Sequence, residues 1–316
     1  MPISIRTLRS RCPETLVDTL DGAFGLSTWA GDTALWKTPA GPLRATISGI
    51  DAIAMGGRRV RGAITVIQQV LNESPRAAKE MVARHNTQPA LGVAVVPSAS
   101  PCTVDVVSRA WMLADEAQDW DKLGLNLSIA AISHMATCVE YRAGAPVKRL
   151  PHHDHPCRWH PSEFIALVAG LHDAGEVVHV GGRTLVAQLQ SVLGWPPEAL
   201  EGGDPRLALS GEFFHSVLGA GLAAEVSVSI DLARAPADRL ARQLNLLELN
   251  RPTGPALFGA WAIDPTGQKL MYSSFWPNLG WVPALLPRIA DWSVERLALV
   301  KDCVFHAMVN RVSTGS

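Results

Sequence analysis

The densest group of metal-ligating residue types lies at the middle of the chain. Four of the ten histidines, His152, His153, His155 and His160, fall within nine residues, and Cys157 lies among them. Imidazole and thiolate groups bind zinc, copper or nickel, so this run is a candidate zinc site that would serve a metal-dependent hydrolase. Its spacing matches neither an HExxH helix nor a CxxC pair. We therefore interpret it first as a polar, proline-rich connection and expect no cofactor.

Other catalytic patterns in the sequence are weak. A His-Asp pair arises by chance in about every second sequence of this composition, and we discount the two pairs found here, His153-Asp154 and His172-Asp173. Gly219 and Gly221 could begin a dinucleotide-binding loop, but residues 212–218 predict a helix where that loop needs a strand. The sequence has neither a GxxxxGK[ST] phosphate loop nor a GxSxG serine elbow. We therefore expect a non-catalytic protein.

Single histidines in apolar segments predict packing roles. A neutral histidine can be buried when its ring nitrogens are hydrogen-bonded. We expect such core positions for the following residues: His134, His179, His215 and His306.

Composition excludes several classes of protein. The 316 residues are 47% hydrophobic, and 28 basic against 29 acidic residues give a net charge of −1. A disordered chain would be less hydrophobic, and a general nucleic-acid binder would be basic, so we expect a folded protein without a nucleic-acid partner. Five cysteines predict reduced thiols and a cytoplasmic location. The longest uncharged stretch, residues 270–287, contains three prolines, so we expect no membrane span.

Prolines near the middle of the chain mark a division into two parts. Pro151, Pro156 and Pro161 fall within eleven residues and forbid a continuous helix or central strand there. We therefore predict a first α+β lobe over residues 1–150, a Pro/His-rich connection over 151–161 and a second α+β lobe over 162–316.

The two halves share a pattern that indicates an internal duplication. A helix opened by proline (residues 74–86 and 235–250) is followed in both by Asn, Pro-Ala-Leu, Gly and a short apolar strand. A Gly-Gly pair, typical of a hairpin turn, precedes each helix by 17 residues in the first half and by 53 in the second. The difference, 53 − 17 = 36, predicts an insertion near residues 191–222. The expected fold is α+β, with two similar lobes that each pack an antiparallel sheet on helices.

Hydrophobic periodicity predicts the remaining elements. We expect a helix over residues 103–120, a strand over 124–133 and a half-buried strand over 223–230. Residues 259–263 and 269–276 predict a hairpin, and residues 293–312 predict a long helix with Ser293 as its N-cap.

Residues 223–312 carry a resemblance to a known family. They predict a strand, a helix ending in Asn250, a strand containing Gly259-x-Trp261, an Asp264-Pro-Thr-Gly267 turn, a strand ending in Pro277-Asn278, and a long helix. This order resembles the second half of the YbjN-like and type III secretion chaperone-like fold, whose tandem actinobacterial members are peptide-binding chaperones. The resemblance implies a non-catalytic chaperone or adaptor, often a homodimer, whose partner is a protein or peptide.

Five aromatic residues near the C-terminus are the candidate contact surface. They fall within 21 residues, and large aromatic side chains often anchor interfaces. The alternative is that they fill the core between the hairpin and the closing helix. A third function class, a structural subunit of a larger assembly, also remains open. The candidate ligand-binding residues are Trp261, Tyr272, Phe275, Trp276 and Trp281.

Overall fold

A computed structural model gives the architecture of the chain. It describes residues 14–53, 59–113, 120–143, 159–174, 176–189, 205–215, 218–230, 232–251, 254–278, 281 and 285–314. The first lobe contains α2 (Glu14–Phe24), β1 (Thr28–Ala30), β2 (Thr33–Thr38), β3 (Gly41–Ile53), β4 (Arg59–Leu71), α3 (Pro75–Asn86), β5 (Val93–Val95), β6 (Thr103–Leu113) and α4 (Trp120–Ala143). The second contains α5 (Pro161–Asp173), β7 (Val177–Gly181), β8 (Thr184–Gln188), β9 (Arg206–His215), β10 (Gly219–Ser229), α7 (Arg234–Asn250), β11 (Gly259–Ile263), β12 (Lys269–Pro277) and α8 (Leu285–Thr314).

The two lobes have the same topology. Each contains a six-stranded antiparallel sheet, with strand order β1-β2-β3-β4-β6-β5 in the first lobe and β7-β8-β9-β10-β12-β11 in the second. In chain order, the described residues of both lobes form a helix, four strands, a helix, two strands and a helix. The predicted α+β fold with two similar lobes is therefore confirmed.

The Gly-Gly pairs used to align the halves occupy different places in this topology. Gly181-Gly182 lies at the turn between β7 and β8, the first two strands of its sheet. Gly56-Gly57 lies outside the described residues, between β3 and β4, the third and fourth strands of the first sheet. The 36-residue difference in spacing follows from this mismatch. Part of the predicted insertion, residues 206–222, instead forms β9 and the start of β10, the counterparts of β3 and β4.

Two adjacent predictions in the first lobe were wrong. Residues 103–113 form strand β6 and not a helix, as their β-branched Thr103, Val104, Val106 and Val107 favour. Residues 124–133 lie in helix α4 and not in a strand. The alternation of apolar residues that suggested a strand arose because this stretch of α4 is buried on several sides, which removes the helical period.

The second lobe contains two similar errors. Residues 212–215, predicted as helix, belong to strand β9. Helix α8 begins at Leu285, so Ser293 lies inside it, where its hydroxyl donates a hydrogen bond to the Ile289 carbonyl at 2.6 Å. Ser293 is thus a back-bonded residue of the helix interior and not its N-cap.

Other local signals were read correctly. Ser74 caps α3 by accepting a hydrogen bond from the Ala77 amide, with Pro75 at the first helical position. Strands β11 and β12 form the predicted hairpin, and Gly267 in its turn has a φ of 81°, which favours glycine. The half-buried strand predicted at residues 223–230 is β10.

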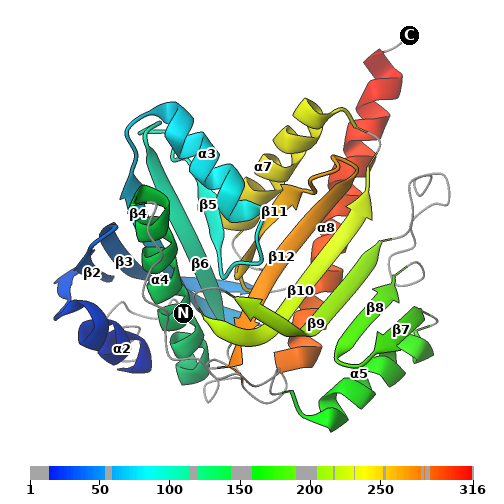
Figure 1. Cartoon of the computed structure of the whole chain (residues 1–316), viewed down its shortest axis with the longest axis horizontal. Coiled ribbons are helices and arrows are strands. Elements are labelled where there is room, and N and C mark those ends of the chain that lie inside the picture. The colour runs from blue at the N-terminus through cyan, green and yellow to red at the C-terminus, as the bar shows by residue number, and fades with distance from the viewer. Residues whose placement is uncertain are drawn as a thin grey trace.

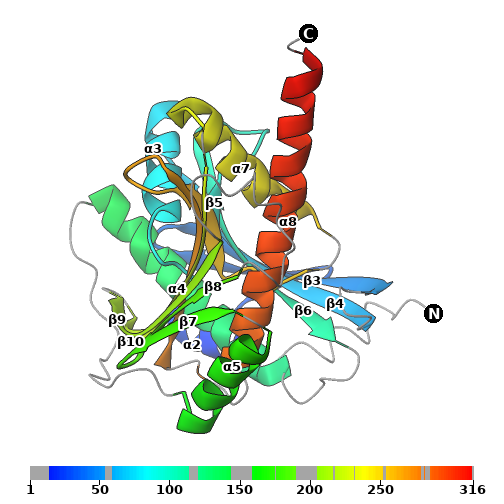
Figure 2. The same ribbon diagram turned by 90° about the vertical axis from the view of Figure 1, so that its right-hand side faces the viewer.

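The lobes join through the segments that precede their edge strands, β5 and β11. Helices α3 and α7 lie side by side, with β5 and β11 next to each other beneath them (Figures 1 and 2). The segment before β5 reaches the second sheet, where the Phe275 amide donates to the Ala90 carbonyl at 3.0 Å. The segment before β11 reaches the first sheet, where Leu257 and Arg109 exchange hydrogen bonds of 2.8 and 3.2 Å. This reciprocal exchange fixes the two lobes against each other.

Candidate functional site

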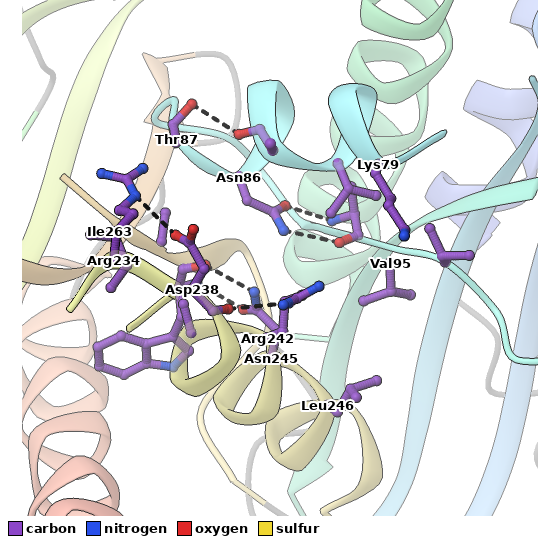
Figure 3. Close-up of a pocket in the computed structure, with 17 residues that line it drawn as sticks. Lys79, Asn86, Thr87, Val95, Arg234, Asp238, Arg242, Asn245, Leu246 and Ile263 are labelled. Atoms are coloured by element: carbon purple, nitrogen blue, oxygen red, sulfur yellow. Dashed lines mark hydrogen bonds and ion pairs between the residues drawn. The ribbon is translucent and has the colours of Figure 1, made fainter. Parts of the chain in front are cut away.

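A groove between the two lobes is the candidate site. It has a volume of about 450 Å³ and is lined by α3 and β5 from the first lobe and by α7 and β11 from the second (Figure 3). These elements are topologically equivalent, so corresponding parts of the two lobes face each other across the groove. Its apolar lining consists of Val82, Ala83, Ala94, Val95, Val96, Ala241, Leu246, Trp261, Ala262 and Ile263.

A buried asparagine holds the edge strand on each side of the groove. Asn86 donates to the Ala94 carbonyl at 2.9 Å and accepts from the Ala94 amide at 2.8 Å. Asn245 makes the same pair of bonds with Trp261, also at 2.9 and 2.8 Å. Each amide thus replaces the neighbouring strand that an edge strand lacks. A ligand cannot add a β-strand at these two positions, because the main-chain groups are already bonded.

The match between the two halves of the sequence did not identify one of these two asparagines. It paired Asn86 with Asn250 at the end of the second helix, whereas the structure pairs Asn86 with Asn245, five residues earlier. Asn245 lies beside Ala241 and Leu244 on the buried face of α7. A polar amide on an otherwise apolar helix face was the signal that could have identified it.

The groove carries an excess of positive charge. Lys79 lies on α3, and Arg234 and Arg242 lie on α7, together with the one lining carboxylate, Asp238. Arg234 pairs with Asp238, with Nε 3.2 Å from Oδ1. Arg242 donates from Nε to the Asp238 main-chain carbonyl at 3.2 Å, and among the described residues it makes no ion pair. Three cations against one carboxylate give the lining a net charge of 3 − 1 = +2.

The described lining of the groove has few side chains of the kinds that perform catalysis, namely Lys79, Asp238 and Thr87. It contains no histidine, cysteine, serine, glutamate or tyrosine. Its one hydroxyl, on Thr87, donates to the main chain of its own helix, with the Ala83 carbonyl at 3.0 Å. A nucleophile with an adjacent base needs residues that this lining does not supply. The geometry therefore provides shape, apolar surface and charge, which serve binding.

The predicted aromatic contact surface lies largely in the core. Trp261, Tyr272, Phe275 and Trp276 are buried, and Trp281 is partly buried. Trp261 donates from Nε1 to Glu248 at 2.6 Å, and Tyr272 lies beneath the Arg296 guanidinium, 3.8 Å from the ring centre. The two-lobed fold covers both faces of the β11–β12 hairpin. The structure therefore favours the core role for these four residues over a contact role, although Trp261 borders the groove.

The candidate metal ligands are only partly described. His152, His153, His155 and Cys157 lie outside the described residues. His160 is exposed at the N-terminus of α5, where its Nδ1 accepts a hydrogen bond from the Ser162 amide at 3.3 Å. Within the part of the chain that the structure describes, no three His, Cys, Asp or Glu residues are grouped as metal ligands. The zinc site and the hydrolase activity stay predictions.

Of the predicted core histidines, His134 is buried, His215 is half-buried, His179 is exposed, and the side chain of His306 lies outside the description. His134 is hydrogen-bonded to Ser108, with Nε2 2.8 Å from Oγ, and His85 lies beside it with ring centres 5.9 Å apart. Burial lowers the pKa of His85 to about 4 and that of His134 well below the usual value.

The serine–histidine contact has a structural role. Ser108 and His134 are fully buried, and the Ser108 hydroxyl also hydrogen-bonds the Leu91 carbonyl. No substrate can reach a hydroxyl in this position. His215 is half-buried; its ring stacks on Phe275 with ring centres 5.0 Å apart, and burial lowers its pKa to about 4.

Among the described helices, none combines the length and apolar character needed to cross a membrane. Comparison of the chain with family models, with curated proteins and with solved structures found no match.

Proposed function

We propose that this chain is a non-catalytic protein- or peptide-binding module that acts as a chaperone or adaptor, with its ligand in the groove between α3 and α7. One observation carries the proposal: equivalent elements of both lobes enclose about 450 Å³ lined mainly by apolar and cationic residues. Pockets of this volume are typical of ligand sites. The size suits a few side chains of an incoming segment and not a folded domain.

The repeated architecture supports this function. Both lobes have the same strand order, and each has one asparagine that clamps its edge strand beside the groove. We infer that the lobes arose by duplication of one unit that had paired with its own copy. Such a history places a groove at the junction of the two units. It also accords with the tandem chaperone fold that residues 223–312 resemble.

Site-specific photo-cross-linking tests the proposal. A photoreactive phenylalanine replaces Leu246, which lines the groove and is 47% exposed, and in a control protein replaces Leu71, which is 66% exposed on β4 and does not line it. In cells that produce the protein, we expect a covalent polypeptide adduct from position 246 and none from position 71. Equal adducts at both positions, or none at 246, would contradict a binding groove.

A second pair of variants ties the adduct to the groove itself. Ala83→Trp places a large ring in the groove from the exposed side of α3, where it removes no core contact. Gln243→Trp places the same ring on the exposed side of α7 outside the groove. The adduct at position 246 should disappear in the first variant and persist in the second.

A further inference from the structure

The charges of the groove identify the chemistry of its ligand. Lys79 on α3 and Arg242 on α7 both reach into the space between the two helices (Figure 3). Within the described part of the chain, neither side chain pairs with a carboxylate, since Asp238 pairs with Arg234. Two cations on facing walls are therefore available to an incoming anion.

The remaining surface of the groove is largely apolar and combines small side chains with the larger Leu246, Trp261 and Ile263. Ala94 and Ala262 lie on the floor strands β5 and β11, and Val95 and Val96 extend the floor on the side of the first lobe. Small floor residues leave room for the side chains of a ligand. Because the asparagine clamps occupy the main-chain groups of Ala94 and Trp261, these positions offer a ligand side-chain contacts instead of a paired strand.

Resting on the proposed function, we propose that the groove selects a segment of another polypeptide in which acidic side chains alternate with apolar ones. The acidic side chains pair with Lys79 and Arg242, and the apolar side chains pack on the floor. Complementary charge speeds association and excludes basic segments, since like charges across an interface repel. The apolar floor contributes the part of the affinity that does not depend on salt.

Fluorescence anisotropy with four labelled octapeptides tests this selectivity. Leucine alternates with aspartate in the first, with serine in the second and with lysine in the third, and the fourth is all aspartate. We expect the Leu-Asp peptide to bind about tenfold more tightly than the Leu-Ser peptide, since two exposed ion pairs together contribute about one decade. The Leu-Lys peptide should bind weakest, and raising the salt should reduce the advantage of the Leu-Asp peptide.

Charge variants assign the selectivity to the two cations. The Lys79→Ala, Arg242→Ala double variant should bind the Leu-Asp and Leu-Ser peptides equally, and the Lys79→Glu, Arg242→Glu variant should prefer the Leu-Lys peptide. Arg239→Ala removes an exposed cation of α7 that does not line the groove and should keep the original preference.

The outcomes separate this inference from the proposed function. If the Leu-Ser peptide binds as tightly as the Leu-Asp peptide, the charge selectivity is refuted while peptide binding in the groove stands. If the all-aspartate peptide binds as tightly as the Leu-Asp peptide, the groove is a simple anion site and the inference is overturned. Absence of binding by the Leu-Asp peptide also overturns it.

Discussion

Lowering the pH from 7.5 to 5.0 should destabilise the protein through its buried histidines. His85 is buried on α3, with Nε2 3.2 Å from the Gly92 carbonyl and its ring beside that of His134. Burial lowers its pKa to about 4, against 6.5 for an exposed histidine. No carboxylate contributes to this shift, so a protonated His85 would be a buried cation beside a second histidine, without an anionic partner to stabilise it.

The sign and size of the effect follow from the two pKa values. Below pH 6.5 the unfolded chain binds a proton at His85, while the folded protein does not until about pH 4. Stability is therefore full above pH 6.5 and is lost as the pH falls toward 4. A pH of 5.0 lies 1.5 units below the pKa of about 6.5 in the unfolded chain, which corresponds to a loss of about 2 kcal/mol of stability for this one histidine. His134 and His215 act in the same direction, so the total loss of stability should exceed the part due to His85.

Urea denaturation of the wild type and two variants at both pH values measures this effect. His85→Gln keeps a donor for the Gly92 carbonyl but cannot titrate, so its loss of stability between pH 7.5 and 5.0 should be smaller by about 2 kcal/mol. His179→Gln changes an exposed histidine of β7 and serves as the matched control. If His85→Gln loses as much stability as the wild type, His85 is not the titrating group and the reasoning is refuted.

Two further predictions concern groups that hold the groove and its floor. Arg296→Met should lower the free energy of unfolding by about 3–5 kcal/mol, because it leaves the buried Glu248 without its ion pair, and adding Glu248→Met should restore part of the loss. Urea denaturation of the single and double variants measures both effects, and an unchanged midpoint in the single variant would contradict the pairing. Asn86→Ala and Asn245→Ala should each lower the free energy of unfolding by about 2–4 kcal/mol, since each leaves two buried main-chain groups without hydrogen-bond partners. The melting temperatures of both variants should fall alike, and a large fall in one alone would contradict the equivalence of the clamps.

Much of the fold could be predicted from short-range signals. The cap and proline at the start of α3, the β11–β12 hairpin and the alternation in β10 are encoded by neighbouring residues, and all were identified. The errors arose where tertiary context decided. Helix α4 is buried against α2 and the first sheet, so its apolar residues have no helical period, and the preceding strand β6 was assigned to a helix.

The groove itself could not be found from the sequence. Its walls are helices about 160 residues apart in the chain, and no local motif links Lys79 to Arg242. Only Trp261 was shared between the sequence candidates and the lining, and it was selected for its size and not for its position. A cluster of large aromatic residues can indicate either an interface or a core, and in the structure four of these five residues fill the core.

The asparagine clamps explain why a groove persists where two sheet edges meet. Strands β5 and β11 are the edge strands of their sheets and lie next to each other, an arrangement in which edges would tend to join into one continuous sheet. The Asn86 and Asn245 amides occupy the main-chain groups that such joining would use. The edges therefore stay apart as the floor of a cavity, and α3 and α7, which carry the clamps, become its walls. The same two side chains thus satisfy each sheet edge and keep open the space that we assign to the ligand.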